Sequence, residues 1–354
     1  MTQPPYATRE DVMRALDVKL TARSARQIDR ALQSASRSID DDLCHRRFYP
    51  EQATRGFDWP GSQYRPSWRL WLDDQELISL TSITSGGTTI SPSDVVLYPL
   101  SGAPYNRVEI NLGSSAAWGG GDTHQRDISI TGLWGYRLDE TTVGTLAAAV
   151  ASTAATTITV TGPASAELGV GSVLRIDDER MIVTGRSMVD TGQGFGDSMT
   201  AAKNDVSIGA ADGTAYAVDE VILRDSERML IVDISGNTLT VERAWDGSVL
   251  AAHTDSAIYA PRALTVVRGA LGTTAATHVD ASSVVRWDPP GLVRDLTIAE
   301  ALNRVTNEQA GYVRTKRSGG GLSSNDQTLA ARDLPALREQ VYNAHGRKAR
   351  HRGV

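Results

Sequence analysis

The side chains with the clearest potential for chemistry in this 354-residue chain are acidic. Asp40–Asp42 form a triplet, and Asp139-Glu140 forms a pair. Adjacent carboxylates can act as general acid and base or bind a cation, but such neighbours are also common on solvated surfaces. The triplet lies near the expected end of a helix, where the helix dipole disfavours negative charge. We therefore expect it to pair with an arginine, such as Arg46, Arg47 or one from another subunit, rather than to perform catalysis.

No other residue pattern matches a known type of active site. Cys44 has His45 beside it but no further supporting motif, so we expect an inert cysteine. The glycine-rich stretch 187–216 lacks the lysine of a phosphate-binding loop and the strand-to-helix arrangement of a dinucleotide site. The six histidines are scattered, and the motifs of serine hydrolases, zinc proteases and calcium loops are missing. We expect no enzymatic activity, no metal and no cofactor.

Composition favours a β-rich protein made in a reducing compartment. The chain has 32 glycines and seven tryptophans but only three phenylalanines. A single cysteine excludes an internal disulfide. The first residues lack the pattern of a signal peptide, and no apolar stretch is long enough to span a membrane. We expect a protein that is assembled in the cytoplasm and binds no membrane.

The net charge of −6 is unevenly distributed. Residues 312–354 carry a charge of +6, which leaves −12 on residues 1–311. A basic end on an acidic body predicts that the end docks on an acidic protein surface or on nucleic acid.

Two helices are expected near the N-terminus. The first spans residues 8–16, where Thr8 and Asp11 can cap it reciprocally. The second begins at Thr21 and carries an apolar stripe at positions 28, 32, 35, 39 and 43. Its opposite face is basic, which suits either a solvated surface or a contact with another subunit. The candidate subunit-interface residues are Arg23, Arg26, Arg30, Arg37, Asp40, Asp41 and Asp42.

Short β-strands are expected after these helices. They are predicted at 68–72, 77–84, 95–98, 107–112 and 127–131, and Gly86-Gly87 predicts a hairpin turn. Five tryptophans lie in or near this region, at positions 59, 68, 71, 118 and 134. They could stack on sugars or bases, but core packing and subunit interfaces are the commoner explanation for tryptophans in β-rich regions.

Residues 142–287 have a different composition and contain an internal repeat. Segment 174–183 is echoed by 223–232, and segment 239–248 by 264–273. Each of the latter pair is followed by two alanines and a histidine, His253 or His278. One hairpin cannot bury its apolar face alone, so the duplication predicts a small β-barrel or sandwich. The stretch 187–216 is expected to form a long loop.

Helix is expected again near the C-terminus. Thr297 and Glu300 match a capping box, and an apolar face continues to Val313. Residues 318–324 predict a flexible linker, and a short helix that opens near Asp333 leads to the basic end. We expect this arm to bind a neighbouring protein through an apolar anchor and several basic side chains. Its contact residues would be Leu334, Leu337, Val341, Arg338, Arg347, Lys348, Arg350 and Arg352.

The order of these elements resembles the head-tail connector (head-to-tail adaptor) proteins of tailed bacteriophages. The resemblance rests on segment 8–16, on the arginine-bearing helix that ends Ile39-Asp-Asp-Asp-Leu43 before Arg46-Arg47-Phe48, and on the strand that ends at Tyr136. The repeated Thr-Val-x-Arg unit is similar to β-modules inserted in phage structural proteins. The resemblance covers residues 6–136 and 292–316, and smaller members lack the insertion.

The resemblance implies an α+β protein with a small helical connector core, antiparallel β-strands and an inserted all-β domain that is like a barrel or sandwich. The core would comprise residues 1–141 and 289–317, the insertion 142–288 and the basic arm 318–354. It implies a ring of about twelve copies at the neck of the virion. The ring would lie between the portal protein, gripped by the arms, and a stopper or tail-completion protein, with genomic DNA passing non-specifically through its centre.

Two other functions compete with this interpretation. The tryptophans and β-repeats would also suit a carbohydrate- or receptor-binding module of a tail or baseplate, although helices at both ends and a basic arm fit that role poorly. A tail hydrolase would need catalytic carboxylates, which are hard to identify in a single sequence.

Overall fold

The computed structural model describes residues 3–16, 22–60, 67–193, 198–254, 256–309 and 326–347. The chain forms two compact units, each made of segments that are distant in sequence. The first unit comprises residues 1–36, 140–270 and 274–335, and the second comprises 37–139, 271–273 and 336–354. This grouping differs from the expected division, because it places the N-terminal helices with residues 140–270 and the first β-region in the other unit.

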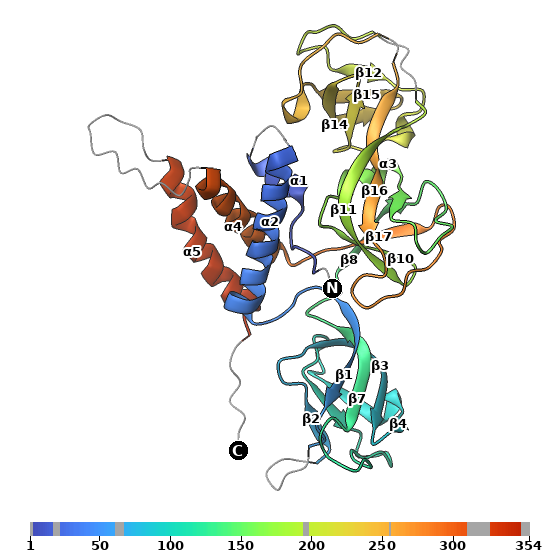
Figure 1. The fold of residues 1–354 in the computed structure, drawn as a ribbon, viewed down its shortest axis with the longest axis vertical. Helices are drawn as coiled ribbons and strands as arrows, with labels where there is room; N and C mark the ends of the chain where they lie inside the picture. Colours follow the sequence, from blue (N-terminus) through green and yellow to red (C-terminus); the bar gives the residue numbers. More distant parts are fainter. Residues whose placement is uncertain are drawn as a thin grey trace, which may run out of the picture. The chain divides into compact units, whose positions relative to one another are not determined.

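Three helices of the first unit form a small bundle (Figure 1). They are α1 (Arg9–Leu16), α2 (Ala22–Ser38) and α4 (Gly291–Gln309). The reciprocal cap predicted for α1 is confirmed, since the Thr8 hydroxyl accepts the Asp11 N–H at 3.1 Å and the Asp11 carboxylate accepts the Thr8 N–H at 2.9 Å. Apolar side chains from all three helices form one buried cluster, which contains Val12, Ile28, Ala31, Leu32, Ala301 and Val305.

The start of α4 differs from the predicted capping box. The helix begins directly after Pro289-Pro290, and the Pro290 carbonyl accepts the N–H groups of Val293 and Arg294 at 2.9 and 3.0 Å. Thr297 therefore lies inside the helix, where its buried hydroxyl donates to the Val293 carbonyl at 2.8 Å. The continuation to Val313 lies outside the described residues.

The rest of the first unit is a ten-stranded antiparallel sheet in the order β12-β15-β14-β13-β16-β11-β10-β17-β8, with β9 paired to β16. Its strands are β8 (Glu140–Thr145), β9 (Thr157–Thr159), β10 (Val173–Ile176), β11 (Glu179–Asp190), β12 (Ser207–Gly209), β13 (Val221–Arg224), β14 (Glu227–Ser235), β15 (Thr238–Glu242), β16 (Ile258–Val267) and β17 (Ser283–Trp287). Short helices are α3 (Gly162–Glu167) and 3-10 turns at Gly213–Ala215 and Trp245–Gly247. The predicted loop 187–216 is shorter than expected, because β11 pairs with β16 as far as Asp190 and β12 occupies part of the remainder.

The internal repeat folds as two copies of one β-unit. Hairpin β10–β11 pairs Leu174 with Met181, and hairpin β13–β14 pairs Ile222 with Met229. This register makes Ile222 the structural equivalent of Leu174. The comparison of the two sequences alone had matched Leu174 with Leu223, which is one residue further along the chain. Each hairpin contributes to its own buried apolar cluster, so the duplication builds two small cores within one sheet.

A buried network of hydrogen bonds holds both ends of the loop 269–277 against the first hairpin. We call this network the first clasp, and its side chains are those of Asp177, Glu179, Arg268 and His278. The Glu179 carboxylate accepts hydrogen bonds from the Arg268 guanidinium at 2.7 and 2.7 Å and from His278 Nε2 at 2.9 Å. It also accepts the N–H groups of Gly269 and Ala276 at 2.8 and 2.9 Å. The other ring nitrogen of His278 lies 2.8 Å from Asp177. The loop 269–277 is therefore held at both ends by one carboxylate.

The second clasp (Asp225, Glu227, Arg243 and His253) reproduces this network atom for atom. Glu227 accepts from Arg243 at 2.8 and 2.8 Å and from His253 Nε2 at 2.8 Å. It also accepts the N–H groups at the two ends of the loop 244–252, at 2.9 and 3.0 Å. His253 Nδ1 lies 2.7 Å from Asp225. The side chains of Glu227, Arg243 and His253 are fully buried, so these hydrogen bonds satisfy charges that water cannot reach.

The second unit contains a four-stranded sheet in the order β1-β7-β3-β4 and a three-stranded sheet in the order β2-β6-β5. Its strands are β1 (Glu51–Phe57), β2 (Arg69–Trp71), β3 (Leu77–Ser85), β4 (Thr88–Ile90), β5 (Val95–Tyr98), β6 (Arg107–Ile110) and β7 (Ile128–Trp134), with a 3-10 turn at Pro92–Asp94. Five of these strands and the turn at Gly86-Gly87 were predicted and are confirmed. Trp134 is fully buried and Trp118 nearly so, which favours the core-packing interpretation of these two tryptophans.

Candidate functional site

The acidic triplet lies in a π-helical turn, Ile39–Cys44, that continues α2. Asp40 is buried and forms an ion pair with Arg37 at 3.0 Å, one turn earlier in the chain. The expected arginine partner is therefore found, but it is Arg37 rather than Arg46 or Arg47. Asp41 and Asp42 are exposed. Burial raises the pKa of the neighbouring Cys44 thiol to about 11, which agrees with the expectation of an inert cysteine.

The basic face of α2 is partly used inside the first unit. Arg30 forms an ion pair with Glu308 of α4 at 2.6 Å, and Arg26 is exposed. The side chain of Arg23 lies outside the described residues. Among the described side chains of this face, Arg26 and the exposed part of Arg30 remain available for a contact with another subunit.

The C-terminal arm is held by its own chain at one end. It contains helix α5 (Asp326–His345), and within the second unit Val341 is fully buried. The Arg347 N–H donates to the Cys44 carbonyl at 3.0 Å, and the Arg347 guanidinium donates to the Asp73 carbonyl at 2.8 Å. Val341 is thus not available as an apolar anchor for a partner, which corrects that expectation. Leu334, Leu337 and Arg338 are half-buried, and Lys348, Arg350 and Arg352 lie outside the described residues.

The end of α5 packs into an aromatic cluster through the ring of His345. Its ring packs edge to face against Phe48 and Tyr136, with centroids 6.1 and 5.6 Å away. Its Nδ1 lies 3.3 Å from the Tyr136 hydroxyl. Burial, together with the nearby Arg137 and Arg46 guanidinium groups, lowers the pKa of His345. The uncharged ring is therefore the form that suits this docked position.

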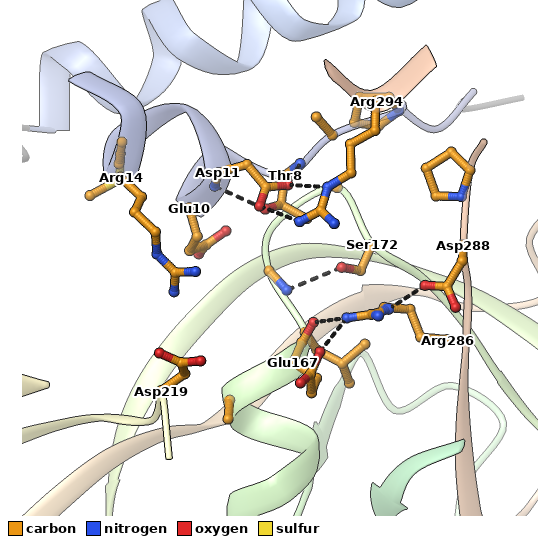
Figure 2. Close-up of a pocket in the computed structure, with 18 of the residues that line it drawn as sticks. Thr8, Glu10, Asp11, Arg14, Glu167, Ser172, Asp219, Arg286, Asp288 and Arg294 are labelled. Carbon is orange, nitrogen blue, oxygen red and sulfur yellow. Dashed lines mark hydrogen bonds and ion pairs between the residues drawn. The ribbon is translucent and has the colours of Figure 1, made fainter. Parts of the chain in front are cut away.

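A candidate binding site of the first unit is a cavity of about 240 Å³ (Figure 2). One wall comes from the N-terminal segment and α1, another from the segment after α3, and a third from the second repeat. Tyr6, Trp245 and Trp287 give the cavity an aromatic character, and Tyr6 packs edge to face on Trp287. The combination of aromatic rings with charged side chains is typical of a site for a polar ligand or a peptide.

Most charged groups around the cavity are already paired. Asp11 accepts from Arg294 at 2.6 Å, and Arg286 bridges Glu167 at 2.6 Å and Asp288 at 2.7 Å. Although burial opposes ionisation of Asp11, the hydrogen bonds from Arg294 and Thr8 lower its pKa. Two charged lining side chains have no hydrogen-bond or ion-pair partner among the described residues: Arg14, whose guanidinium points toward the second repeat, and Asp219, which faces it across the cavity (Figure 2).

The glycine at position 272 explains how the first clasp loop can touch strand β1. The Leu271 carbonyl accepts the Gln52 N–H at 2.8 Å, and a Cβ on Gly272 would lie only 1.8 Å from the Gln52 carbonyl oxygen. Gly236, in the turn between β14 and β15, has a similar positive φ of 58° against 79°, and a Cβ there would meet no atom within 4 Å. Alanine costs comparable backbone strain at both sites, so a comparison of the two isolates the contact with β1.

We expect Gly272→Ala to lower the free energy of unfolding by about 2 kcal/mol more than Gly236→Ala, because only the first substitution forces a side chain into a packed backbone. Urea denaturation followed by circular dichroism measures both values. Equal losses in the two variants would show that the contact between Leu271 and Gln52 contributes nothing to stability.

The two clasps are not predicted by the sequence. The paired histidines stand out in the repeat, but no local pattern gives a role to them or to Glu179, Glu227, Arg243 and Arg268. The available signal was the fixed spacing: in both copies an arginine precedes its histidine by ten residues, and an Asp-x-Glu-Arg-Met segment lies upstream. The clasps are saturated with hydrogen bonds, so we assign them to stability rather than to ligand binding.

Within the described ranges, no group of His, Cys, Asp or Glu side chains is arranged to hold a metal ion, and no helix is long and apolar enough to cross a membrane. No protein-family model, no curated protein and no solved structure matches the chain.

Proposed function

We propose that this chain is a structural head-to-tail adaptor of a tailed bacteriophage, which forms a ring between the portal and the proteins of the tail. The observation that supports this most is the way the helical bundle is made. An ion pair between Asp11 and Arg294 joins α1 to α4, and one between Arg30 and Glu308 joins α2 to α4. The β-rich segments lie between these helices in the sequence. A bundle closed by both ends of the chain is a rigid base on which β-domains can be inserted without disturbing it.

The charge distribution agrees with a channel for DNA. The −12 on residues 1–311 would repel the phosphate backbone and let DNA slide through the ring. The half-buried face of α5, with Leu334, Leu337 and Arg338, is the part of the arm that we assign to the portal contact. Because Val341 and Arg347 are held by the second unit, the arm would present α5 from a fixed base instead of as a free tail.

A nonsense mutation in the gene of the virus that encodes this chain tests the proposal. We expect DNA-filled heads and separate tails in electron micrographs of the lysate, since the joining ring is missing. Supplying the intact chain from a plasmid should restore joined virions. Complete virions that fail only to adsorb to cells would instead indicate a receptor-binding module, and normal infectious virions would contradict both functions.

A further inference from the structure

The end of α5 and the residues that follow it are docked within the second unit. Val341 is fully buried, and the Arg347 N–H donates to the Cys44 carbonyl at 3.0 Å. The Arg347 guanidinium donates to the Asp73 carbonyl at 2.8 Å. His345 lies between these two anchors in the sequence. Because segments near a chain terminus open locally at a lower free energy than core strands do, a change at this one ring can decide whether the segment stays docked.

Two guanidinium groups already contact the tyrosine on which His345 packs. The guanidinium carbons of Arg46 and Arg137 lie 4.6 and 5.2 Å from the centre of the Tyr136 ring. The His345 ring meets the same tyrosine edge to face, with the two ring centres 5.6 Å apart, and its Nδ1 lies 3.3 Å from the tyrosine hydroxyl. A protonated His345 would therefore place a third positive charge around one tyrosine, in a partly buried site where like charges repel more strongly than in water.

The surroundings offer little to balance such a charge. Glu76 forms an ion pair with Arg46 at 3.5 Å, and among the described residues no carboxylate contributes to the electrostatic environment of His345. The carbonyl end of a helix attracts a cation, but the Tyr342 carbonyl of α5 already accepts the Gly346 N–H at 2.7 Å. Burial and the two guanidinium groups therefore prevail, and they lower the pKa of His345.

The direction of the pH effect follows from this difference. Because His345 is harder to protonate when docked than when exposed to water, protons favour the undocked segment. Docking is complete above the ordinary histidine pKa of 6.5 and weakens as the pH falls below it. The clasps of the first unit keep their stabilisation down to pH 4.5, so the segment responds to milder acid than they do.

We propose that His345 is a proton-operated latch: when its ring takes up a proton, the end of α5 and Arg347 detach, while the rest of the second unit stays folded. Detachment uncovers Phe48 and Tyr136, which are buried in the docked state. Mild acid thus frees the C-terminal arm from the base that otherwise fixes it. The inference does not rest on the adaptor function.

Hydrogen–deuterium exchange of the full-length protein, measured by mass spectrometry on a peptide that contains residues 341–347, tests the latch. After correction for the intrinsic pH dependence of exchange, we expect this peptide to exchange up to about tenfold faster at pH 5.5 than at pH 7.5, the limit set by the protonation of an exposed histidine. Peptides from β1, β3 and β7 should not change. His345→Phe keeps an aromatic ring that cannot be protonated, so it should exchange equally at both pH values.

His124→Gln is the matched control, because His124 is an exposed histidine of the same unit. It should respond as the wild-type protein does. Arg137→Gln removes one of the two positive charges beside the ring and should reduce the response, which provides a test even if His345→Phe fails to dock. A wild-type change below about twofold, an equal response in wild type and His345→Phe, or an undiminished response in Arg137→Gln would each overturn the proposal. None of these results would bear on whether the protein forms a ring.

Discussion

Glu179→Gln and Glu227→Gln are each expected to lower the free energy of unfolding by about 3–5 kcal/mol, because each leaves a buried arginine and a buried histidine without their shared carboxylate. An amide offers one acceptor oxygen where the carboxylate offered two, and its NH₂ group would face N–H donors. The melting temperature of the first unit should fall by roughly 10 °C. Differential scanning calorimetry and urea titration measure both quantities.

The matched control is Glu308→Gln, which removes an exposed carboxylate paired with Arg30 at 2.6 Å. We expect that substitution to cost less than about 1 kcal/mol, because exposed ion pairs contribute little to stability. The double variant of Glu179 and Glu227 should lose nearly the sum of the two single losses, since the clasps share no residue. A loss below about 1 kcal/mol in either clasp variant would contradict the role that we assign to these carboxylates.

The same two carboxylates are expected to make the first unit unstable in acid. Burial alone would raise their pKa, but the hydrogen bonds from arginine, histidine and backbone N–H groups hold the pKa of Glu179 and of Glu227 at about 2. Because this pKa is below the ordinary value of 4.5, the stabilisation is complete above pH 4.5 and is lost as the pH falls toward 2. Each clasp should lose about 3 kcal/mol over that range.

Urea titrations between pH 7 and pH 2.5 measure this loss. The wild-type protein should show a steep decline in the free energy of unfolding below pH 4.5. The variant with both Glu179→Gln and Glu227→Gln should start lower and decline less, since it no longer carries these titrating groups. Parallel declines in the two proteins would show that the acid sensitivity comes from other carboxylates.

Local patterns in the sequence were sufficient for much of the fold. The strands of the second unit follow from apolar runs bounded by turn residues, and the Thr8–Asp11 cap follows from two side chains three positions apart. Strand β1 was missed because Glu51–Phe57 contains polar residues, a glycine and no clear alternation of burial. Its strand conformation is set by pairing with β7, a partner more than 70 residues away in sequence.

The candidate sites depended on long-range contacts that local patterns do not encode. The cavity combines Asp11, Trp245 and Trp287, which no spacing rule connects. The repeat is visible in the sequence, but its register and the two clasps are not. They depend on hydrogen bonds that the loops 269–277 and 244–252 donate to the carboxylates of Glu179 and Glu227. The burial of Val341 was missed for the same reason, since it depends on packing between the C-terminus and the β-region rather than on the pattern within α5.

The most direct test of the proposed adaptor function is the shape and mass of the purified full-length protein, alone and with the portal protein of the same virus. Native mass spectrometry and negative-stain electron microscopy should show a closed ring of many copies with an open centre, formed alone or on the portal. A chain that stays monomeric at all concentrations and in the presence of the portal, or that forms fibres, would contradict the proposal.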